Sequence, residues 1–541
     1  MVTGPSSSSS PYLHPSVTGA TITSLVTAGD TINAYVIPGS PDGLGAFDNN
    51  DGTFTVLLNH EFSSTTGSVR SHGSAGAFVT KFVIRKIDYT VDSATDLVHD
   101  VHIWNGTGYN VYNSSNPSTQ AAFNRFCSAD LPAVNAFFNP ATGWGTNARI
   151  FMNSEECGTE GRAFAHVVTG ASAGHSFELP FLGKGNFENA VACPYASDKT
   201  VVVMLDDAMP GQVYFYIGKK KNSGTDTEKA GLTEGKLFGV SVDGMLQETA
   251  SADTTFRLID LGQVQSITGT SLNTLSSNLG VSTFLRPEDG AWDPSRPGDF
   301  YFATTNSYNN PSRLWRLRFS DPDSLEAGGM ITAVLDGTEG QQMLDNLTID
   351  KSGIILLQED PGANSHLARV WQYNIASDQL VQVARHDPSR FVTSGSRFLT
   401  EDEESSGVID VQEIAGPGKF LLTTMAHYGM PAPVVEGGQL MLLYNPESAL
   451  LAGIKKTSLQ GKIQIFPNPA NGYFTVVAPA KQFELVLTEL SGKLVSPEKY
   501  MIRNSRDIQK SFDCSALSAG IYFMRIRMGD SECRDKLVIT R

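Results

Sequence analysis

The chain has 541 residues and a mass of 58.2 kDa, and a composition of 40% hydrophobic and 18% charged residues excludes bulk disorder. Its 40 basic and 56 acidic residues give a formal charge of −16, which argues against nucleic acid as a partner, because binding the phosphate backbone requires a basic surface. No window supplies the roughly 18 consecutive apolar residues of a membrane-spanning helix, so we expect no transmembrane segment.

The first 455 residues divide into an arm and a large body. Residues 1–44 open on a stretch rich in Ser and Pro, which predicts an extended N-terminal arm followed by a first strand. From residue 45 to 455, short apolar runs alternate with clusters of Gly, Asp, Asn and Pro, a pattern typical of strands joined by turns. We therefore expect an all-β body.

Six apolar runs in the body end alike, with a polar or acidic residue directly after a strand-like stretch. Repeats of this kind are expected of a propeller, because one four-stranded sheet cannot bury both of its faces alone. The sequence therefore predicts a six-bladed β-propeller-like body. The six runs are TVLLNHE (55–61), RIFMNSEE (149–156), VVVMLDD (201–207), FYFATTN (300–306), IILLQED (354–360) and FLLTTMAHY (420–428).

Four of these runs are preceded by a second acidic position at the start of another strand, namely Glu188, Glu288, Asp345 and Glu404. In a propeller the inner strand and the loops leading into it line the central channel, so we expect these carboxylates to converge on the axis. Taken singly, each residue also fits an ordinary turn. Converging carboxylates would repel one another and shift each other's pKa, which implies bound cations.

The last segment, residues 456–541, has a different pattern. Apolar and polar residues alternate, with turn signals every eight to twelve positions, which predicts a small C-terminal β-sandwich. The motifs FPNP (466–469) and LSAGIY (517–522), together with a basic C-terminus, resemble the C-terminal sorting domain of the type IX secretion system. The resemblance implies export by the type IX secretion machinery, and therefore a secreted or cell-surface protein.

Several ordered motifs in the body carry a second resemblance. Over residues 45–445 the chain resembles the PhoX-type alkaline phosphatases, monomeric propellers whose channel holds an iron and calcium cluster. This implies Ca2+ and Fe3+ as cofactors, small-molecule phosphate esters as substrates and a monomeric protein. The motifs are GWGTNARIFMNSEE (143–156), GNFENAVACP (185–194), FLRPEDGAWDP (284–294), DNLTID (345–350) and the segment 404–407.

The resemblance also implies roles for single residues. It makes Cys127 the thiolate ligand of iron, and Arg286 the arginine that contacts the substrate phosphate. Glu155 and Glu156 match a pair of glutamates in the family, either of which could be a direct ligand. The channel carboxylates that would hold iron and calcium are Glu188, Glu288, Asp345 and Glu404.

Elementary chemistry supports part of this assignment. Thiolate binds iron well and carboxylate oxygens suit calcium, so a mixed site needs one soft ligand among many hard ones. The planar fork of Arg286 suits a phosphate, whose oxygens gain charge in the transition state. Bound cations would neutralise the phosphate and lower the pKa of bound water. For His60 and His427, which end two of the runs, both metal ligation and a structural hydrogen bond stay open.

The sequence thus predicts a secreted, metal-dependent phosphomonoesterase. Two alternatives remain, because Gly143 stands where the family usually has Pro, and Ser154 where it often has Cys. One is a calcium-stabilised propeller without catalysis that serves as a cell-surface binding module. The other is a calcium-dependent esterase or lactonase, since a propeller fold does not fix function.

Overall fold

The computed structural model describes residues 1–452, 463–478, 482–489, 494–501, 508–528 and 531–540. The chain divides into two compact units, Met1–Leu450 and Leu451–Arg541. Strands dominate both units, as the sequence predicts, and among the described residues no helix has the length and apolar character needed to cross a membrane.

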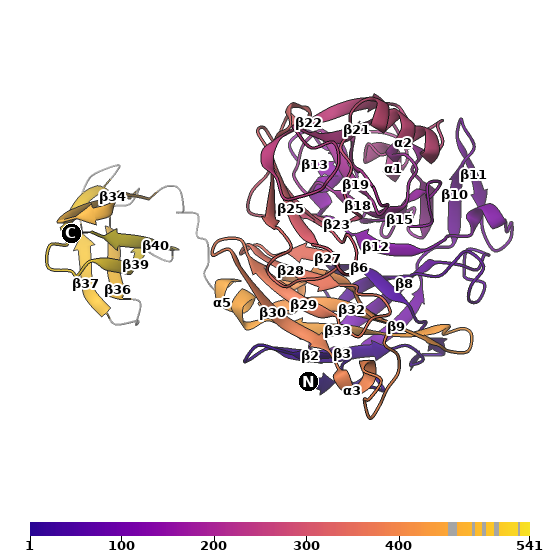
Figure 1. The fold of residues 1–541 in the computed structure, drawn as a ribbon, viewed down its shortest axis with the longest axis horizontal. Coiled ribbons are helices and arrows are strands. Elements are labelled where there is room, and N and C mark those ends of the chain that lie inside the picture. The colour runs from indigo at the N-terminus through magenta and orange to yellow at the C-terminus, as the bar shows by residue number, and fades with distance from the viewer. Residues whose placement is uncertain (453–462, 479–481, 490–493, 502–507, 529–530, 541) are drawn as a thin grey trace. The chain divides into compact units, whose positions relative to one another are not determined.

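The first unit is a six-bladed β-propeller, and the body is shown in Figure 1. Blade 1 contains β6 (Pro41–Asp48), β7 (Thr53–His60), β8 (Phe78–Arg85) and β9 (Val91–Asp96). Blade 2 contains β12 (Phe126–Asp130), β15 (Ile150–Glu155), β16 (Ala163–Val167) and β17 (His175–Glu178), with β10 (Asp100–Trp104) and β11 (Tyr109–Tyr112) added at its outer edge.

Blades 3 and 4 form one continuous sheet through pairing of their outer strands. Blade 3 contains β18 (Phe187–Ala192), β19 (Lys199–Asp206), β20 (Val213–Lys219), β21 (Gly235–Val242) and β22 (Asp253–Gly262). Blade 4 contains β23 (Pro287–Trp292), β24 (Asp299–Thr304), β25 (Arg313–Phe319) and β26 (Gly329–Leu335).

Blades 5 and 6 complete the ring. Blade 5 contains β27 (Leu344–Ile349), β28 (Ile354–Glu359), β29 (Arg369–Asn374) and β30 (Gln379–His386). Blade 6 contains β31 (Glu403–Asp410), β32 (Lys419–Gly429), β33 (Glu436–Tyr444) and β3 (Thr21–Thr27). The six apolar runs singled out in the sequence form the second strands of the blades, which are β7, β15, β19, β24, β28 and β32.

The N-terminal residues add strands to the last two blades of the ring. β3 pairs antiparallel with β33, with Thr21 opposite Tyr444, and β1 (Val2–Thr3) pairs with β3 in parallel. β2 (Leu13–Pro15) adds a strand to β30 of blade 5. The segment expected as an arm and first strand therefore supplies the outer strands of two blades, which leaves fewer open sheet edges.

The remaining elements are short. The α-helices are α1 (Asp226–Lys229), α2 (Gly269–Asn278), α3 (Pro388–Phe391), α4 (Gln412–Ala415) and α5 (Pro446–Ala452), and the remaining short strands of this unit are β4 (Thr31–Ile32), β5 (Tyr35–Val36), β13 (Phe138–Asn139) and β14 (Trp144–Gly145).

Hydrophobic cores lie between neighbouring blades, which explains why the second strands are apolar on both faces. Phe126, Phe151 and Phe164 of blade 2 pack with Leu57 and Val79 of blade 1. The interface of blades 3 and 4 is the most aromatic, with Phe215 facing Trp292 and Phe300. Each fully buried aromatic side chain stabilises the fold by about 1.5–3 kcal/mol relative to its exposed state.

The first strand of each blade lies nearest the axis and is called its inner strand: β6, β12, β18, β23, β27 and β31. Each inner strand contacts the inner strands of the two neighbouring blades, so the six form a closed ring. Figure 1 shows β6, β12, β18, β23 and β27 gathered in the middle of the body. Residues near the start of these strands therefore come from six distant segments and meet at one place.

The second unit is a small β-sandwich, as the sequence predicts. Phe474, Leu485, Met524 and Leu537 pack in its own apolar core. Its strands are β34 (Gln464–Asn471), β35 (Tyr473–Ala478), β36 (Gln482–Glu489), β37 (Leu494–Met501), β38 (Ile508–Asp513), β39 (Gly520–Met528) and β40 (Ser531–Ile539).

Candidate metal centre

The second residue of every inner strand carries a carboxylate or a thiol, which are side chains of a kind that can bind metal. All six side chains are buried although five are carboxylates, which is unusual unless they are paired or bind metal. The sequence predicts four of the six as acidic strand starts, and the resemblance to PhoX-type phosphatases implies the fifth, Cys127, as a thiolate. In blade order the six residues are Asp42, Cys127, Glu188, Glu288, Asp345 and Glu404.

A β-bulge occurs at this position in blade after blade. The pairing register between the inner and second strands shifts across Asp42, Cys127, Glu188, Glu288 and Asp345, and in blade 6 it shifts just after Glu404. A bulge bends the strand locally and re-aims a side chain. A bulge therefore accompanies the carboxylate or thiol at the start of each inner strand.

Seven of these and neighbouring side chains form three overlapping groups, here called the axial cluster. Within each group the ligand atoms all lie within 4.8 Å of one another. Cys127 belongs to the first two groups and Glu188 to the last two, so the groups form one continuous chain of donors. The groups are Asp42 with Glu61 and Cys127, then Cys127 with Glu156 and Glu188, then Glu188 with Glu288 and Asp345.

The thiol of Cys127 is the single soft donor of the axial cluster. Its Sγ donates a hydrogen bond to Glu156 Oε2 at 3.1 Å. Burial and the negative charge of Glu61 and Glu188 raise its pKa well above the usual range, so the thiol is protonated unless a cation replaces the proton. The cluster thus offers one soft donor among hard oxygens, a set in which different positions suit different cations.

The carboxyls around the axis are too crowded to ionise together. Burial, followed by the charges of neighbours, raises the pKa of Glu61 to about 8 and that of Asp360 to about 7. The pKa values of Asp42 and Asp345 lie well above the usual range for the same reasons, with Glu404 among the neighbours responsible. Cations would remove this repulsion.

Glu188 and Glu288 complete the same picture. Burial raises the pKa of both carboxyls well above the usual range, and Glu156 and Asp207 are the first carboxylates to add to the effect at Glu188 and at Glu288 respectively. Glu188 is also fixed from blade 2, because the backbone N–H and the hydroxyl of Ser128 donate to its Oε1 at 3.1 and 2.5 Å. Hydrogen bonds across blades thus set the position of this carboxylate.

Arg286 lies beside the third group of the axial cluster. Its Nη2 is 2.9 Å from Glu288 Oε1, and it also hydrogen-bonds Asp207. The side chain is 27% exposed, whereas that of Glu288 is 1% exposed, so the guanidinium is reachable from solvent and the carboxylate is not. The charge of Glu288 raises the pKa of Arg286 above its usual range, so it stays a cation.

A second arginine, Arg125, occupies the equivalent place in blade 2. Its Nη2 lies 2.5 Å from both Glu61 Oε1 and Glu156 Oε2. Arg125 stands two residues before Cys127 and Arg286 two residues before Glu288, and both arginines have positive φ angles, 47° and 60°. Non-glycine residues rarely adopt this conformation, which tends to persist at functional sites.

The structure separates the two adjacent glutamates Glu155 and Glu156. Glu155 is held by Arg162, whose Nε and Nη2 each donate to it at 2.7 Å. Glu156 instead faces Cys127 and Arg125. Only Glu156 is therefore a member of the axial cluster.

Of the two histidines that end apolar runs, His60 makes structural hydrogen bonds and His427 faces carboxylates. His60 bonds the Gly39 carbonyl at 2.7 Å and the Thr80 hydroxyl at 2.8 Å, which is a structural position at the strand end. His427 lies 3.6 Å from Glu404 and 3.0 Å from Glu436. Burial lowers the pKa of His427, but these two carboxylates outweigh burial and raise it to about 11.

Four further acidic residues of the site were not singled out by role in the sequence: Asp42, Glu61, Asp207 and Asp360. Glu61, Asp207 and Asp360 are the last residues of three of the six apolar runs, so their position at a strand end could have indicated them. Asp42 follows Pro41 as Glu288 follows Pro287, and each pair opens an inner strand.

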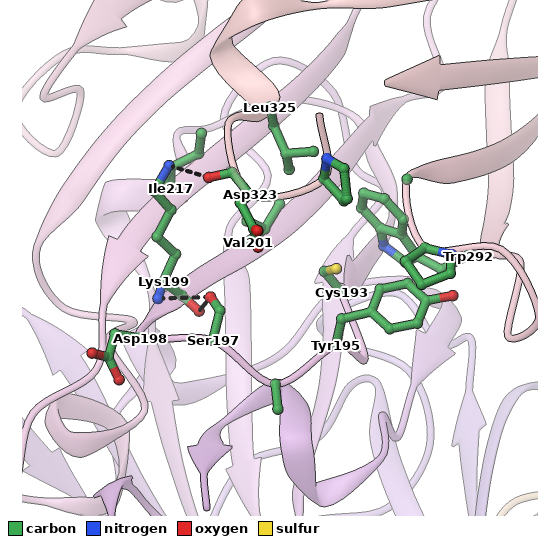
Figure 2. A pocket seen from close by; sticks show the side chains of 14 residues that line it. Cys193, Tyr195, Ser197, Asp198, Lys199, Val201, Ile217, Trp292, Asp323 and Leu325 are labelled. Carbon is green, nitrogen blue, oxygen red and sulfur yellow. Dashed lines mark hydrogen bonds between the residues drawn. The ribbon is translucent and has the colours of Figure 1, made fainter. Parts of the chain in front are cut away.

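A separate cavity of about 410 Å3 lies between blades 3 and 4, away from these residues (Figure 2). Val201 and Ile217 line it from blade 3, and Trp292 and Leu325 from blade 4. Its wall is largely apolar and contains none of the axial cluster. The concentration of perturbed titratable groups, and not cavity size, therefore locates the candidate site.

Comparison with known proteins identifies a family for the C-terminal unit. Residues 464–540 match the family model of the secretion system C-terminal sorting domain. The C-terminal unit therefore marks the chain for export by type IX secretion to the cell surface or the extracellular space. No curated protein matches the chain.

One similar solved structure is that of PhoX from Pseudomonas fluorescens in complex with vanadate, a transition state analogue. The match covers 82% of this chain and 98% of the PhoX chain, with a TM-score of 0.58 and 11% sequence identity. At this identity the likeness shows the fold alone, which is that of a PhoX-like propeller. A second match is PorZ, a surface component of the type IX secretion system of Porphyromonas gingivalis. It covers 95% of this chain and 61% of the PorZ chain at 12% identity, and its TM-score of 0.32 is too low to show a common fold.

Proposed function

We propose that the protein is a secreted, metal-dependent phosphomonoesterase whose site lies in the propeller channel. The observation that carries the proposal is the position of Arg286. A solvent-reachable guanidinium lies 2.9 Å from Glu288, and Glu288 shares a potential metal position with Glu188 and Asp345. A cation-binding carboxylate group beside an arginine fork is the arrangement that binds a phosphate dianion.

The side chains fit the metals that the PhoX-like fold implies. Asp42 Oδ1 is buried and has no hydrogen-bond partner among the described residues, so a cation would satisfy an otherwise orphaned oxygen. We assign Ca2+ to Glu188, Glu288 and Asp345, with Glu404 contributing nearby charge, because these offer only oxygen donors. We assign Fe3+ to the groups that share Cys127, the one thiol among them.

When bound, such cations supply Lewis acidity, which neutralises a phosphate ester and activates water. The chain itself binds and orients the ester. Nη1 of Arg286 has no hydrogen-bond partner among the described residues, so its two N–H groups are available to equatorial phosphate oxygens. Asp207 fixes the plane of the guanidinium, which limits the orientations in which the phosphate can be held.

One observation favours a second candidate, the calcium-stabilised propeller without catalysis. Nε and Nη2 of Arg286 are already engaged by Asp207 and Glu288, as in a structural ion-pair network. Such networks also perturb pKa values without any catalytic role. A calcium-dependent esterase or lactonase would use the same carboxylates on a carboxylic ester.

Hydrolysis by the metal-loaded full chain separates these candidates. The phosphatase proposal expects turnover of an aryl phosphate monoester and a loss of about 100- to 1000-fold in Arg286→Ala, the scale of removing one transition-state donor. Arg257→Ala is the matched control, because Arg257 forms an ion pair with Asp243 and both side chains are more than half exposed. Stabilisation by calcium without turnover of any ester would favour the binding module, and turnover of carboxylic esters alone would favour the esterase.

A further inference from the structure

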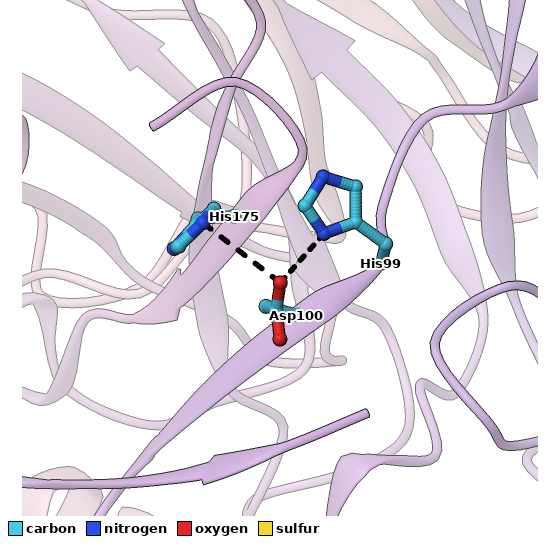
Figure 3. Close-up of side chains that lie close together, drawn as sticks. All are labelled: His99, Asp100 and His175. Carbon is cyan, nitrogen blue, oxygen red and sulfur yellow. Dashed lines mark hydrogen bonds and ion pairs between the residues drawn. The ribbon is translucent and has the colours of Figure 1, made fainter. Parts of the chain in front are cut away.

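Outside the channel, two histidines and an aspartate gather at the outer edge of blade 2 (Figure 3). His99 Nδ1 lies 2.6 Å from Asp100 Oδ2, and His175 Nε2 lies 3.8 Å from the same oxygen. In the sheet order, β16 and β15 separate these strands from the inner strand β12. The group therefore lies apart from the axial cluster.

The backbone fixes the three residues relative to one another. Asp100 of β10 and His175 of β17 are direct partners in a parallel pair, so their side chains emerge side by side. The backbone N–H groups of His99 and Asp100 both donate to the Gly174 carbonyl, at 2.9 and 3.3 Å. A Cβ on Gly174 would come within 2.2 Å of His99 Nε2, so glycine leaves the space that the imidazole fills.

Neighbouring groups aim the donor atoms at one point. The Asn113 amide donates to Asp100 Oδ1 at 2.8 Å, which directs Oδ2 toward the two histidines. His99 Nε2 lies 3.1 Å from the Ala173 carbonyl, which can only accept a hydrogen bond, so Nε2 carries the proton. In a neutral His99 the lone pair of Nδ1 then faces a carboxylate oxygen, and only a proton or a cation between them relieves the repulsion.

His175 is supported in the same manner. Its Nδ1 lies 3.0 Å from Nε2 of His102, the next residue but one along β10 from Asp100. If Nδ1–H donates to His102, the Nε2 lone pair of His175 faces Asp100. A metal-binding histidine commonly donates its second ring N–H to another group in this way, which fixes its tautomer and its orientation.

We propose that His99, Asp100 and His175 bind a divalent first-row transition cation, with zinc as its probe. Two imidazole nitrogens and one carboxylate oxygen suit zinc, whereas calcium prefers oxygen donors alone. Ligands about 2.0–2.1 Å from zinc stand about 3.3 Å apart in a tetrahedron, so binding would open the 2.6 Å separation and close the 3.8 Å one. The side chains are 53%, 22% and 33% exposed, which leaves room for water as the fourth ligand.

Zinc titration of the full chain by calorimetry tests this site, with excess calcium present to occupy the channel oxygens. The wild type should show a zinc-binding step that His99→Gln and His175→Gln each weaken by more than about tenfold. His14→Gln is the matched control, because His14 is a partly exposed histidine 3.6 Å from a single carboxylate, Asp387, and should leave the titration unchanged. Equal zinc binding by the wild type and both cluster variants would overturn the proposal.

Copper(II) in place of zinc gives an independent readout that does not depend on stoichiometry. The electron paramagnetic resonance spectrum of the wild type should show coupling to two imidazole nitrogens, and His175→Gln should show coupling to one. A spectrum without nitrogen coupling would contradict the site. Asp100→Asn retains the side-chain shape, and it should weaken zinc while its circular dichroism stays that of the wild type, which separates loss of a ligand from loss of fold.

Discussion

Arg286 donates two hydrogen bonds to the carboxylate of Asp207, from Nε at 2.7 Å and from Nη2 at 3.0 Å. Asp207 follows β19 of blade 3, and Arg286 precedes β23 of blade 4, so this pair joins two blades where their strands approach the axis. Asp207 is 6% exposed, and it therefore acts as a buried anchor for a more accessible cation.

This anchor makes Asp207 a positioning residue for the proposed hydrolysis. Asp207→Ala should lower kcat by about tenfold to a hundredfold, the equivalent of about 1.5–3 kcal/mol for hydrogen bonds to a charged group. KM should change less than kcat if the guanidinium still reaches the phosphate but is poorly oriented. Steady-state kinetics on an aryl phosphate measures both constants, and unchanged kcat in this variant would remove Asp207 from the proposed site.

Cys127 provides a test of metal identity. Because its thiol is the one soft donor in the axial cluster, Cys127→Ser should lower the iron content sharply while calcium largely persists. Cys193→Ser is a suitable control, because that thiol lines the cavity between blades 3 and 4, and it should leave both metals unchanged. Elemental analysis of the three proteins decides, and equal iron in all of them would exclude Cys127 as a ligand.

The raised pKa values of the axial carboxyls predict how pH and calcium act on stability. Burial and neighbouring charge raise the pKa of Glu61 to about 8 and that of Asp360 to about 7, above their unfolded values of about 4. The folded state then binds more protons than the unfolded state between these values, so this contribution is present below about pH 4 and lost as pH rises toward 8. Calcium should therefore raise Tm more at pH 8 than at pH 5.

The buried histidines act on stability in the opposite direction. Burial lowers the pKa of His166 and His386 to about 3, so their contribution is present above about pH 6.5 and lost as pH falls. Calcium does not affect that contribution, and the difference in Tm with and without calcium isolates the carboxyls. Thermal unfolding at pH 5 and pH 8 measures this difference, and an equal calcium shift in Tm at the two pH values would show that the axial carboxyls are not responsible.

The sorting domain should affect export and not the chemistry of the site. Met1–Leu450 is a compact unit with its own cores between blades, so a chain that ends at Leu450 should keep its Tm and its metal content. In a host with type IX secretion it should stay inside the cell, because residues 464–540 are absent. Fractionation of cells and medium checks export, and normal secretion of the shortened chain would contradict the role of this domain.

The blade repeat was predictable from sequence because each second strand is apolar on both faces and ends at a polar residue. Glu188, Glu288, Asp345 and Glu404 stood out because each precedes such a strand. Asp42 did not, because the stretch Ser40-Pro41-Asp42-Gly43 has the composition of a turn, whereas the structure makes Asp42 the second residue of β6. Local composition cannot distinguish a turn from a bulged strand that opens with proline.

The arginine pair shows a different limit of sequence reasoning. The contact of Arg125 with Glu61 and Glu156 joins residues 64 and 31 positions apart and depends on the packing of blade 1 against blade 2. Arg125 and Arg286 share a positive φ angle at a position two residues before Cys127 and Glu288 respectively. The residue type alone does not reveal this backbone conformation. Likewise, Glu156 and not Glu155 belongs to the axial cluster because Arg162 hydrogen-bonds Glu155.

In the proposed site, side chains from blades 1 to 5 jointly hold metal ions at the propeller axis, and Glu404 of blade 6 adds nearby charge. Elemental analysis of the protein purified from its natural host tests this most directly. We expect calcium and iron at one or more equivalents each, and calcium should be greatly reduced when Glu188, Glu288 and Asp345 are replaced together by their amides. Only trace calcium and iron in the natural protein would contradict it.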